Sequence, residues 1–281
     1  MIRFPSYDGA HLAVHPTVQG GPPLVCLPGG PGRASRYLGD LGGLSRHRRL
    51  LRLDLRGSGY SASGDPAGYR CDRMVADVEA LRVHLGLERM DLLAHSAAGN
   101  LALLYAARHP ERLRRLVLVT PDARAVGICV TERERRAVLR RRADEPWYED
   151  ACKAITAWRA GEDTPAIRLE AAPFRYGRWN EAAFAHARCE EAELARSRPV
   201  AAGYYAEGAF DPALTRRALA CLQAPVLVIA GALDPDLTPE RAAELARLFP
   251  DGRLVVDDCS AHFPWVTMPR WFTKTVHDFL R

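Results

Sequence analysis

The chain has 281 residues, of which 48% are hydrophobic and 26% charged, and its formal net charge is +5. This composition is typical of a soluble globular protein, either one domain with an insertion or two smaller domains. No apolar run approaches the roughly 20 residues that a membrane span needs. The densest basic run, at 132–142, is interrupted by glutamates. This pattern indicates a helix with a solvated basic face and argues against nucleic-acid binding.

Seven cysteines are spread widely along the chain: Cys26, Cys71, Cys129, Cys152, Cys189, Cys221 and Cys259. An odd number without close pairs indicates reduced thiols and argues against a zinc site. The first nine residues, M-I-R-F-P-S-Y-D-G, lack the apolar core of a signal peptide. We therefore expect a cytoplasmic protein without a bound metal or cofactor.

Strand and helix patterns alternate along much of the sequence. Apolar runs predict strands at 2–4, 10–18, 23–27, 49–53, 90–94, 116–119, 225–230 and 253–256. Helical spacing of apolar residues predicts helices at 71–85, 100–108, 239–248 and 271–280. Unbroken apolar strands that alternate with helices predict an α/β fold, with a mostly parallel sheet covered on both faces.

Between 122 and 214 the sequence contains no apolar run of strand length, and segments rich in Ala, Arg and Glu replace it. We expect a helical cap here, inserted between two parts of the core at 1–121 and 215–281. Its aromatic residues predict a small core within the insertion. Trp179 and Tyr204 are candidates for the wall of a substrate pocket.

Two glycine-rich loops follow predicted strands. The loop at 28–32, P-G-G-P-G, leaves backbone N–H groups free to stabilise an oxyanion, although a plain turn is the alternative. The loop at 54–61, D-L-R-G-S-G-Y-S, allows a tight turn at the end of a strand, where ligands bind in open α/β sheets. A phosphate loop is disfavoured because a third glycine and an immediate helix are both missing.

The stretch at 90–100, M-D-L-L-A-H-S-A-A-G-N, combines a buried strand, a sharp turn and the start of a helix. Ser96 lies at the turn between small residues. This pattern is typical of a nucleophile elbow, in which strained backbone exposes a serine above a parallel sheet. The usual pattern is G-x-S-x-G, but Ala94 and Ala98 take the glycine positions here and Gly99 follows. Taken alone, the stretch also fits a buried strand-turn-helix without catalytic chemistry.

Two later residues can complete a site around Ser96. A serine hydroxyl needs a base within hydrogen-bond reach, and the base needs a partner that fixes its tautomer. His262, after the last predicted strand, is the expected base, and Asp234, at the end of the strand before it, is the expected partner. The N–H groups of Gly30 and Ala97 are the expected oxyanion donors. Four aspartates compete with Asp234 for the partner role: Asp122, Asp236, Asp257 and Asp258.

Together these motifs resemble the α/β-hydrolase superfamily, specifically the branch that contains the proline iminopeptidases. The loop at 28–32 resembles H-G-G-P-G with proline in place of histidine, and 54–61 resembles D-x-R-G-x-G-x-S in full. His262 begins a sequence similar to H-F-P, and 174–186 is similar to a cap segment of relatives. The resemblance covers nearly the whole chain. It implies a serine hydrolase that acts on a small molecule or short peptide.

The resemblance leaves the substrate open. Iminopeptidases carry tryptophan after the nucleophile, where this chain has Ala97, and use acidic cap residues to hold the free amino group of the substrate. Glu170 and Glu207 are the candidates for that role. Esters, thioesters and lactones are alternative substrates. A non-hydrolytic acyl transferase or cyclase, or a ligand-binding protein that keeps the fold, also fits the sequence.

Overall fold

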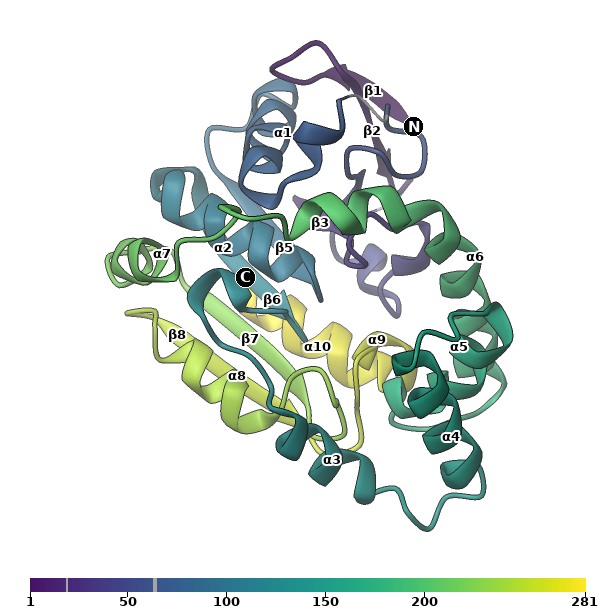
Figure 1. Ribbon diagram of the computed structural model, residues 1–281. Helices are drawn as coiled ribbons and strands as arrows, with labels where there is room; N and C mark the ends of the chain where they lie inside the picture. Colours follow the sequence, from purple (N-terminus) through teal and green to yellow (C-terminus); the bar gives the residue numbers. More distant parts are fainter. Residues whose placement is uncertain (19, 63–64) are drawn as a thin grey trace.

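A computed structural model describes residues 1–18, 20–62 and 65–281 (Figure 1). Its centre is an 8-stranded sheet in the order β1-β2-β4-β3-β5-β6-β7-β8. The strands are β1 (Ile2–Pro5), β2 (His11–Pro16), β3 (Pro23–Leu27), β4 (Arg49–Asp54), β5 (Met90–His95), β6 (Leu113–Val119), β7 (Val226–Gly231) and β8 (Gly252–Asp257). In the sheet order from β4 to β8 all neighbours pair in parallel, whereas β1 pairs antiparallel with β2, and β2 pairs antiparallel with β4. The predicted α/β class is confirmed.

Each parallel strand contributes to two apolar cores, one on each face of the sheet. In β5, for example, Leu92 and Ala94 pack in one core and Leu93 in the other. Helices α1 (Cys71–His84), α2 (Ala98–Arg108), α7 (Pro212–Leu219) and α8 (Pro239–Ala246) contribute to the first core. Helices α9 (Pro264–Thr267) and α10 (Pro269–Phe279) contribute to the second. Because both faces are covered, the strands need apolar side chains at successive positions.

Most differences from the predicted boundaries lie at the ends of elements. β6 begins at Leu113, three residues before the predicted start, because Leu113 pairs with Met90. α2 begins at Ala98, directly after the elbow. α10 begins at Pro269, two residues before the predicted start, because the fixed φ of proline suits the first helical position. Short 3-10 helices connect several elements: η1 (Ser35–Leu38), η2 (Leu44–Arg46), η3 (Pro66–Tyr69), η4 (Pro110–Arg112), η5 (Arg124–Val126) and η6 (Ala172–Arg175).

Four α-helices lie between β6 and α7 in the chain: α3 (Glu132–Arg140), α4 (Tyr148–Arg159), α5 (Pro165–Ala171) and α6 (Glu181–Tyr204). Of these, α4, α5 and α6 lie together on the right of the view in Figure 1. Phe174 packs edge-on against Trp147 and Tyr148 in a small separate core. The predicted boundary after residue 214 falls inside α7. No helix in the described part of the chain has the length and apolar character to cross a membrane.

The loop at 54–61 has a structural role. Both oxygens of Asp54 accept hydrogen bonds, Oδ1 from the backbone N–H of Ser35 at 2.7 Å and Oδ2 from that of Tyr60 at 2.9 Å. A Cβ at Gly59 would lie 2.2 Å from Asp54 Oδ2. The fully buried Arg56 pairs with Asp77 through two hydrogen bonds. The conformation of this loop is therefore fixed by its own carboxylate and by a buried ion pair.

Candidate active site

The turn after β5 presents Ser96 at the carboxyl edge of the sheet. Ser96 has φ +53°, a left-handed conformation that is strained for a residue with a side chain. A Cβ at Gly29 would lie 2.7 Å from Ser96 Cβ, and a Cβ at Gly99 would lie 2.5 Å from Pro121 Cβ. The closest approaches around the elbow therefore occur at Gly29 and Gly99. Because Ala94 and Ala98 fit inside the core, the glycines of the usual pattern are not needed at these two positions.

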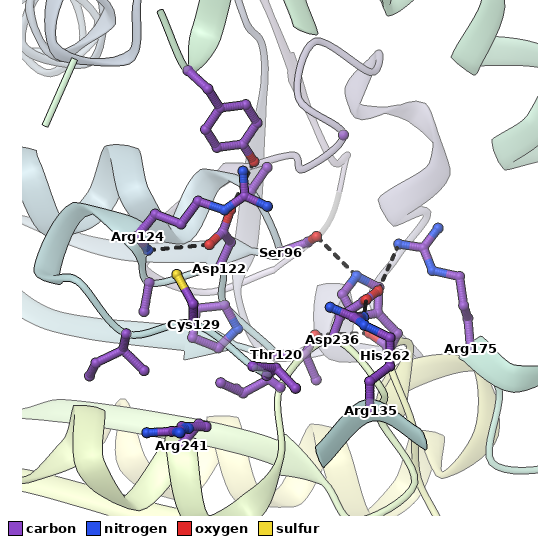
Figure 2. A pocket seen from close by; sticks show the side chains of 18 residues that line it. Ser96, Thr120, Asp122, Arg124, Cys129, Arg135, Arg175, Asp236, Arg241 and His262 are labelled. Carbon is purple, nitrogen blue, oxygen red and sulfur yellow. Dashed lines mark hydrogen bonds and ion pairs between the residues drawn. The ribbon is translucent and has the colours of Figure 1, made fainter. Parts of the chain in front are cut away.

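The structure brings Ser96, Asp234 and His262 into one hydrogen-bonded chain. His262 Nε2 lies 2.9 Å from Ser96 Oγ (Figure 2), and His262 Nδ1 lies 3.0 Å from Asp234 Oδ2. Asp234 and His262 are buried, whereas Ser96 is half-buried. An Nδ1 proton donated to the carboxylate leaves the Nε2 lone pair facing the serine hydroxyl. This is the arrangement in which a histidine can accept a proton from serine.

Two backbone N–H groups lie beside the serine without a partner among the described residues. They belong to Gly30 and Ala97, which line the same cavity as Ser96. Gly30 has φ +126°, and a Cβ there would lie 2.9 Å from the backbone nitrogen of Arg33. Free N–H groups next to a nucleophile can stabilise the negative charge that develops on a carbonyl oxygen.

A second histidine holds the loop that carries His262. His95, the last residue of β5, lies with Nε2 3.0 Å from the backbone carbonyl of His262. Because a carbonyl only accepts, Nε2 must carry the proton, and Nδ1 then accepts from the hydroxyl of Tyr37 at 2.7 Å. The Tyr37 hydroxyl in turn accepts the N–H of Gly29 at 2.6 Å. This chain connects the loop at 28–32, the elbow and the His262 loop.

His95 is expected to make the protein sensitive to acid. Burial, together with the nearby His262 ring, lowers the pKa of His95 well below its usual value. The unfolded chain, with a pKa of about 6.5, then binds a proton that the folded protein excludes. As the pH falls below about 6.5, we expect the free energy of unfolding to decrease by up to about 1.4 kcal/mol per pH unit for this group. Urea unfolding between about pH 7.5 and 5.5 measures this slope. Burial lowers the pKa of His186 too, which adds to the slope in the same direction.

Two glutamine variants separate the contribution of His95 from that of other groups. His95→Gln removes the titration of the buried ring, so we expect a smaller slope. His11→Gln changes an exposed ring, and we expect the wild-type slope. An undiminished slope in His95→Gln would show that other groups cause the acid sensitivity.

One cavity opens next to the serine, and a second cavity adjoins it. One has a volume of about 390 Å³ and is lined by Ser96, His262 and both N–H donors. The other, of about 610 Å³, extends to Trp158 and Phe174 in the helical insertion. They share four lining residues: Gly30, Arg135, Arg175 and Asp236. Together the cavities provide room for a small substrate at the nucleophile.

The four residues predicted to bind substrate lie outside the lining of both cavities. Glu170 and Glu207 are exposed. Trp179 packs against Tyr176 and Phe184. Tyr204 is fully buried, and its hydroxyl donates to the backbone carbonyl of Ala97 at 2.8 Å. Tyr204 therefore supports the elbow from behind.

Asp236 is a second carboxylate close to His262 and Asp234. Desolvation by the surrounding protein raises the pKa of Asp236, although its side chain is 41% exposed, but attraction to Arg175, His262 and Arg135 outweighs this effect and lowers the pKa to about 2. Ligand atoms of Asp234, Asp236 and His262 lie within 4.8 Å of one another, a spacing that a cation could use. The carboxylate of Asp236 is already paired with Arg135 and lies 3.7 Å from Arg175 (Figure 2). This pairing disfavours a metal at these oxygens.

Comparison with known proteins identifies the family. Residues 22–268 match the family described as alpha/beta hydrolase fold. The chain belongs to this family. The expected resemblance to α/β hydrolases is thus confirmed. This α/β hydrolase is 28% identical to N-formylmaleamate deformylase of Pseudomonas putida over 235 residues. The aligned residues are 81% of this chain and 77% of that protein.

Two further similarities define what this α/β hydrolase shares with known proteins. A proline iminopeptidase of Lactobacillus helveticus is 41% identical over 102 residues, which are 34% of this chain and 35% of the iminopeptidase. An esterase of Thermogutta terrifontis has the same fold, with a TM-score of 0.71 and 23% identity over 100% of this chain and 97% of the esterase. The iminopeptidase similarity is therefore confined to about a third of either chain.

Proposed function

We propose that this α/β hydrolase cleaves a small ester or amide through an acyl-enzyme on Ser96. The observation that carries the proposal is the hydrogen-bonded chain from Ser96 through His262 to Asp234. The serine oxygen attacks the acyl carbon while His262 Nε2 takes the hydroxyl proton. The same nitrogen returns this proton to the leaving group as the bond to the acyl carbon breaks. Water then attacks the acyl-enzyme, the ester formed on Ser96, while His262 again acts as the base. This step releases the acid and restores Ser96.

The N–H groups of Gly30 and Ala97 are proposed as the oxyanion donors. Both line the cavity that contains the serine, and a donor of this kind contributes about 3 kcal/mol to transition-state stabilisation. Asp234, buried and acceptor-only when ionised, would hold the Nδ1 proton of His262 and stabilise the imidazolium.

The acidic residues near the site give little support to release of an N-terminal residue, the iminopeptidase reaction. Such a substrate carries an ammonium group, which needs an available carboxylate. The two acidic residues that line the cavity at Ser96 are Asp122 and Asp236, and both are paired with arginine. The relative named as a deformylase, similar over most of both chains, favours small amides as a second candidate beside esters.

Labelling with a fluorophosphonate tests the proposal. We expect one covalent adduct per chain, in the peptide that contains Ser96, because the probe reacts with a serine activated by a histidine. Intact mass and peptide mapping measure this. Ser45→Ala, in η2, should be labelled like the wild type, and Ser96→Ala should remain unlabelled. Full labelling of Ser96→Ala would overturn the assignment.

A further inference from the structure

The cavity at Ser96 has an excess of positive charge. Among the residues that the structure describes, its lining contains four arginines and two acidic residues: Arg124, Arg135, Arg175, Arg241, Asp122 and Asp236. The adjoining cavity adds Arg33 and Arg159 and one further acid, Glu132. An interior with more cations than anions attracts a negatively charged ligand and repels an ammonium group.

Three of the four arginines in the cavity at Ser96 are held by other groups of the protein. Arg241 pairs with Glu134 and Glu244, Arg135 donates to the carbonyl of Pro235 and to Asp236, and Arg124 lies 3.5 Å from Asp122 and 4.5 Å over the Tyr205 ring. These contacts use much of the capacity of the Arg241 and Arg135 guanidinium groups, whereas the Arg124 side chain is 54% exposed, so water can accept from its N–H groups.

Arg175 is held more weakly than Arg135 and Arg241, and its side chain is less exposed to solvent than that of Arg124. Its guanidinium has five N–H donors, yet among the described residues its side chain forms one hydrogen bond, a long one of 3.5 Å to Glu190. Its distance to Asp236 is 3.7 Å, and its buried Nε has no partner among the described residues. Leaving buried donors without acceptors is unfavourable unless a ligand supplies them.

The position of Arg175 is nevertheless well fixed next to the triad. Its backbone carbonyl accepts the N–H of His262 at 3.0 Å, and its guanidinium lies 5.4 Å over the ring of Phe263. Arg175 lines both cavities, and Figure 2 shows its side chain beside His262 and Asp236. A group bound by Arg175 would therefore be part of the molecule that Ser96 attacks.

The carboxylates around Arg175 do not neutralise the positive charge of the arginines there. Glu190 is shared with the buried Arg33, and Asp236 is shared with Arg135. Glu132 also lies 3.9 Å from Arg135 and is shared with Arg159, so four guanidinium groups face three carboxylates around the two cavities. One further carboxylate would balance the charge, and the planar fork of an arginine suits such a group through two parallel hydrogen bonds.

We propose that the substrate carries a carboxylate, in addition to the bond that is cleaved, and that Arg175 binds it. The inference rests on the proposed function, because it names the substrate class of the same cavity. A neutral substrate of the same shape leaves the donors of Arg175 unpaired. An amino-terminal substrate adds a positive charge to a positive cavity.

Matched ester pairs test the proposal by turnover. One pair is the 4-nitrophenyl monoester of adipate against 4-nitrophenyl hexanoate, and the other is 4-acetoxybenzoate against its methyl ester. The first carries the carboxylate on the acyl group and the second on the leaving group. We expect kcat/KM to favour the anion in at least one pair by about 10-fold or more, and Arg175→Gln to bring that preference close to unity. Arg175→Lys should restore part of it.

A control variant accounts for overall charge. Arg136→Gln removes the same charge from an exposed side chain that pairs with Glu132 and lies outside both cavities, so we expect the wild-type preference. Equal kcat/KM for both members of each pair, unaltered by Arg175→Gln, would overturn the proposal while leaving the serine mechanism intact.

Binding without turnover separates this proposal from the proposed function. In Ser96→Ala, we expect adipamate, the monoamide of adipate, to raise the melting temperature, and neutral hexanamide to have little effect. Adding Arg175→Gln should remove the shift. If the shift depends on Arg175 but the wild-type protein cleaves none of the four esters, the carboxylate site would stand. The proposed ester hydrolysis would be contradicted. No shift with adipamate would count against the carboxylate site itself.

Discussion

Replacing Ser96 with alanine is expected to lower kcat by about 10⁵- to 10⁶-fold for any ester or amide that the wild-type protein hydrolyses. The reason is the position of the hydroxyl, 2.9 Å from the Nε2 of His262 and next to two free N–H groups. Without the oxygen no acyl-enzyme can form. The remaining rate would come from substrate binding and from the N–H donors acting on a water molecule. Steady-state kinetics with 4-nitrophenyl hexanoate measure the loss.

The double variant provides the control. If Ser96 and His262 act as one unit, His262→Ala alone should cost about as much as Ser96→Ala, and the two together should cost little more. Additive losses would indicate that the two side chains work in separate steps. A kcat within about tenfold of wild type in Ser96→Ala would contradict the acyl-enzyme mechanism.

The sequence was informative where the backbone decides the position of a residue. The carboxyl ends of parallel strands meet at one edge of the sheet, so the residues that follow β5, β7 and β8 come together whatever the intervening chain does. Ser96, Asp234 and His262 follow these three strands. The order of predicted strands was therefore enough to predict their convergence, although the elbow lacks two of its usual glycines.

The lining of the cavity could not be predicted in the same way. Arg33 follows β3 and Glu190 lies in α6, 157 residues later, yet their side chains form a buried ion pair. In the sequence, Glu190 is one of many charges in a helix rich in alanine, arginine and glutamate. Arg175 lies within the recognised segment 174–186, but its contacts depend on how the insertion packs over the sheet. Helical periodicity identifies the buried face of a helix and says nothing of its partner.

The roles of His95 and Tyr37 were also missed, for a different reason. In the sequence, His95 precedes the nucleophile, at a position of the G-x-S-x-G pattern that any residue can occupy. Its importance comes from Tyr37 on one side and the carbonyl of His262 on the other. A histidine that hydrogen-bonds through both nitrogens inside a core has no local signature in the sequence. In the structure, its low exposure of 1% and its two hydrogen bonds distinguish it from a surface histidine.

The partner of His262 gives the second large prediction. Asp234 is fully buried, its Oδ2 accepts the Nδ1 proton of His262 at 3.0 Å, and its Oδ1 accepts the backbone N–H of Asp236 at 2.8 Å. In Asp234→Asn, the amide oxygen must stay on the N–H of Asp236, because an NH2 group there would place two donors face to face. The NH2 group then points at Nδ1 and forces the proton of the imidazole onto Nε2. A protonated Nε2 cannot accept the proton of Ser96, so we expect kcat to fall by about 10⁴-fold.

The matched control uses one of the competing aspartates. Asp258→Asn makes the same chemical change at an exposed position, and we expect kcat within about twofold of wild type. Thermal unfolding of both variants checks that the fold is intact, and labelling with a fluorophosphonate should be slow in Asp234→Asn and normal in Asp258→Asn. If Asp234→Asn kept more than about a tenth of the wild-type kcat, the tautomer of His262 would have to be fixed by another group. Asp236 would then be the first to test, because it too lies close to the imidazole.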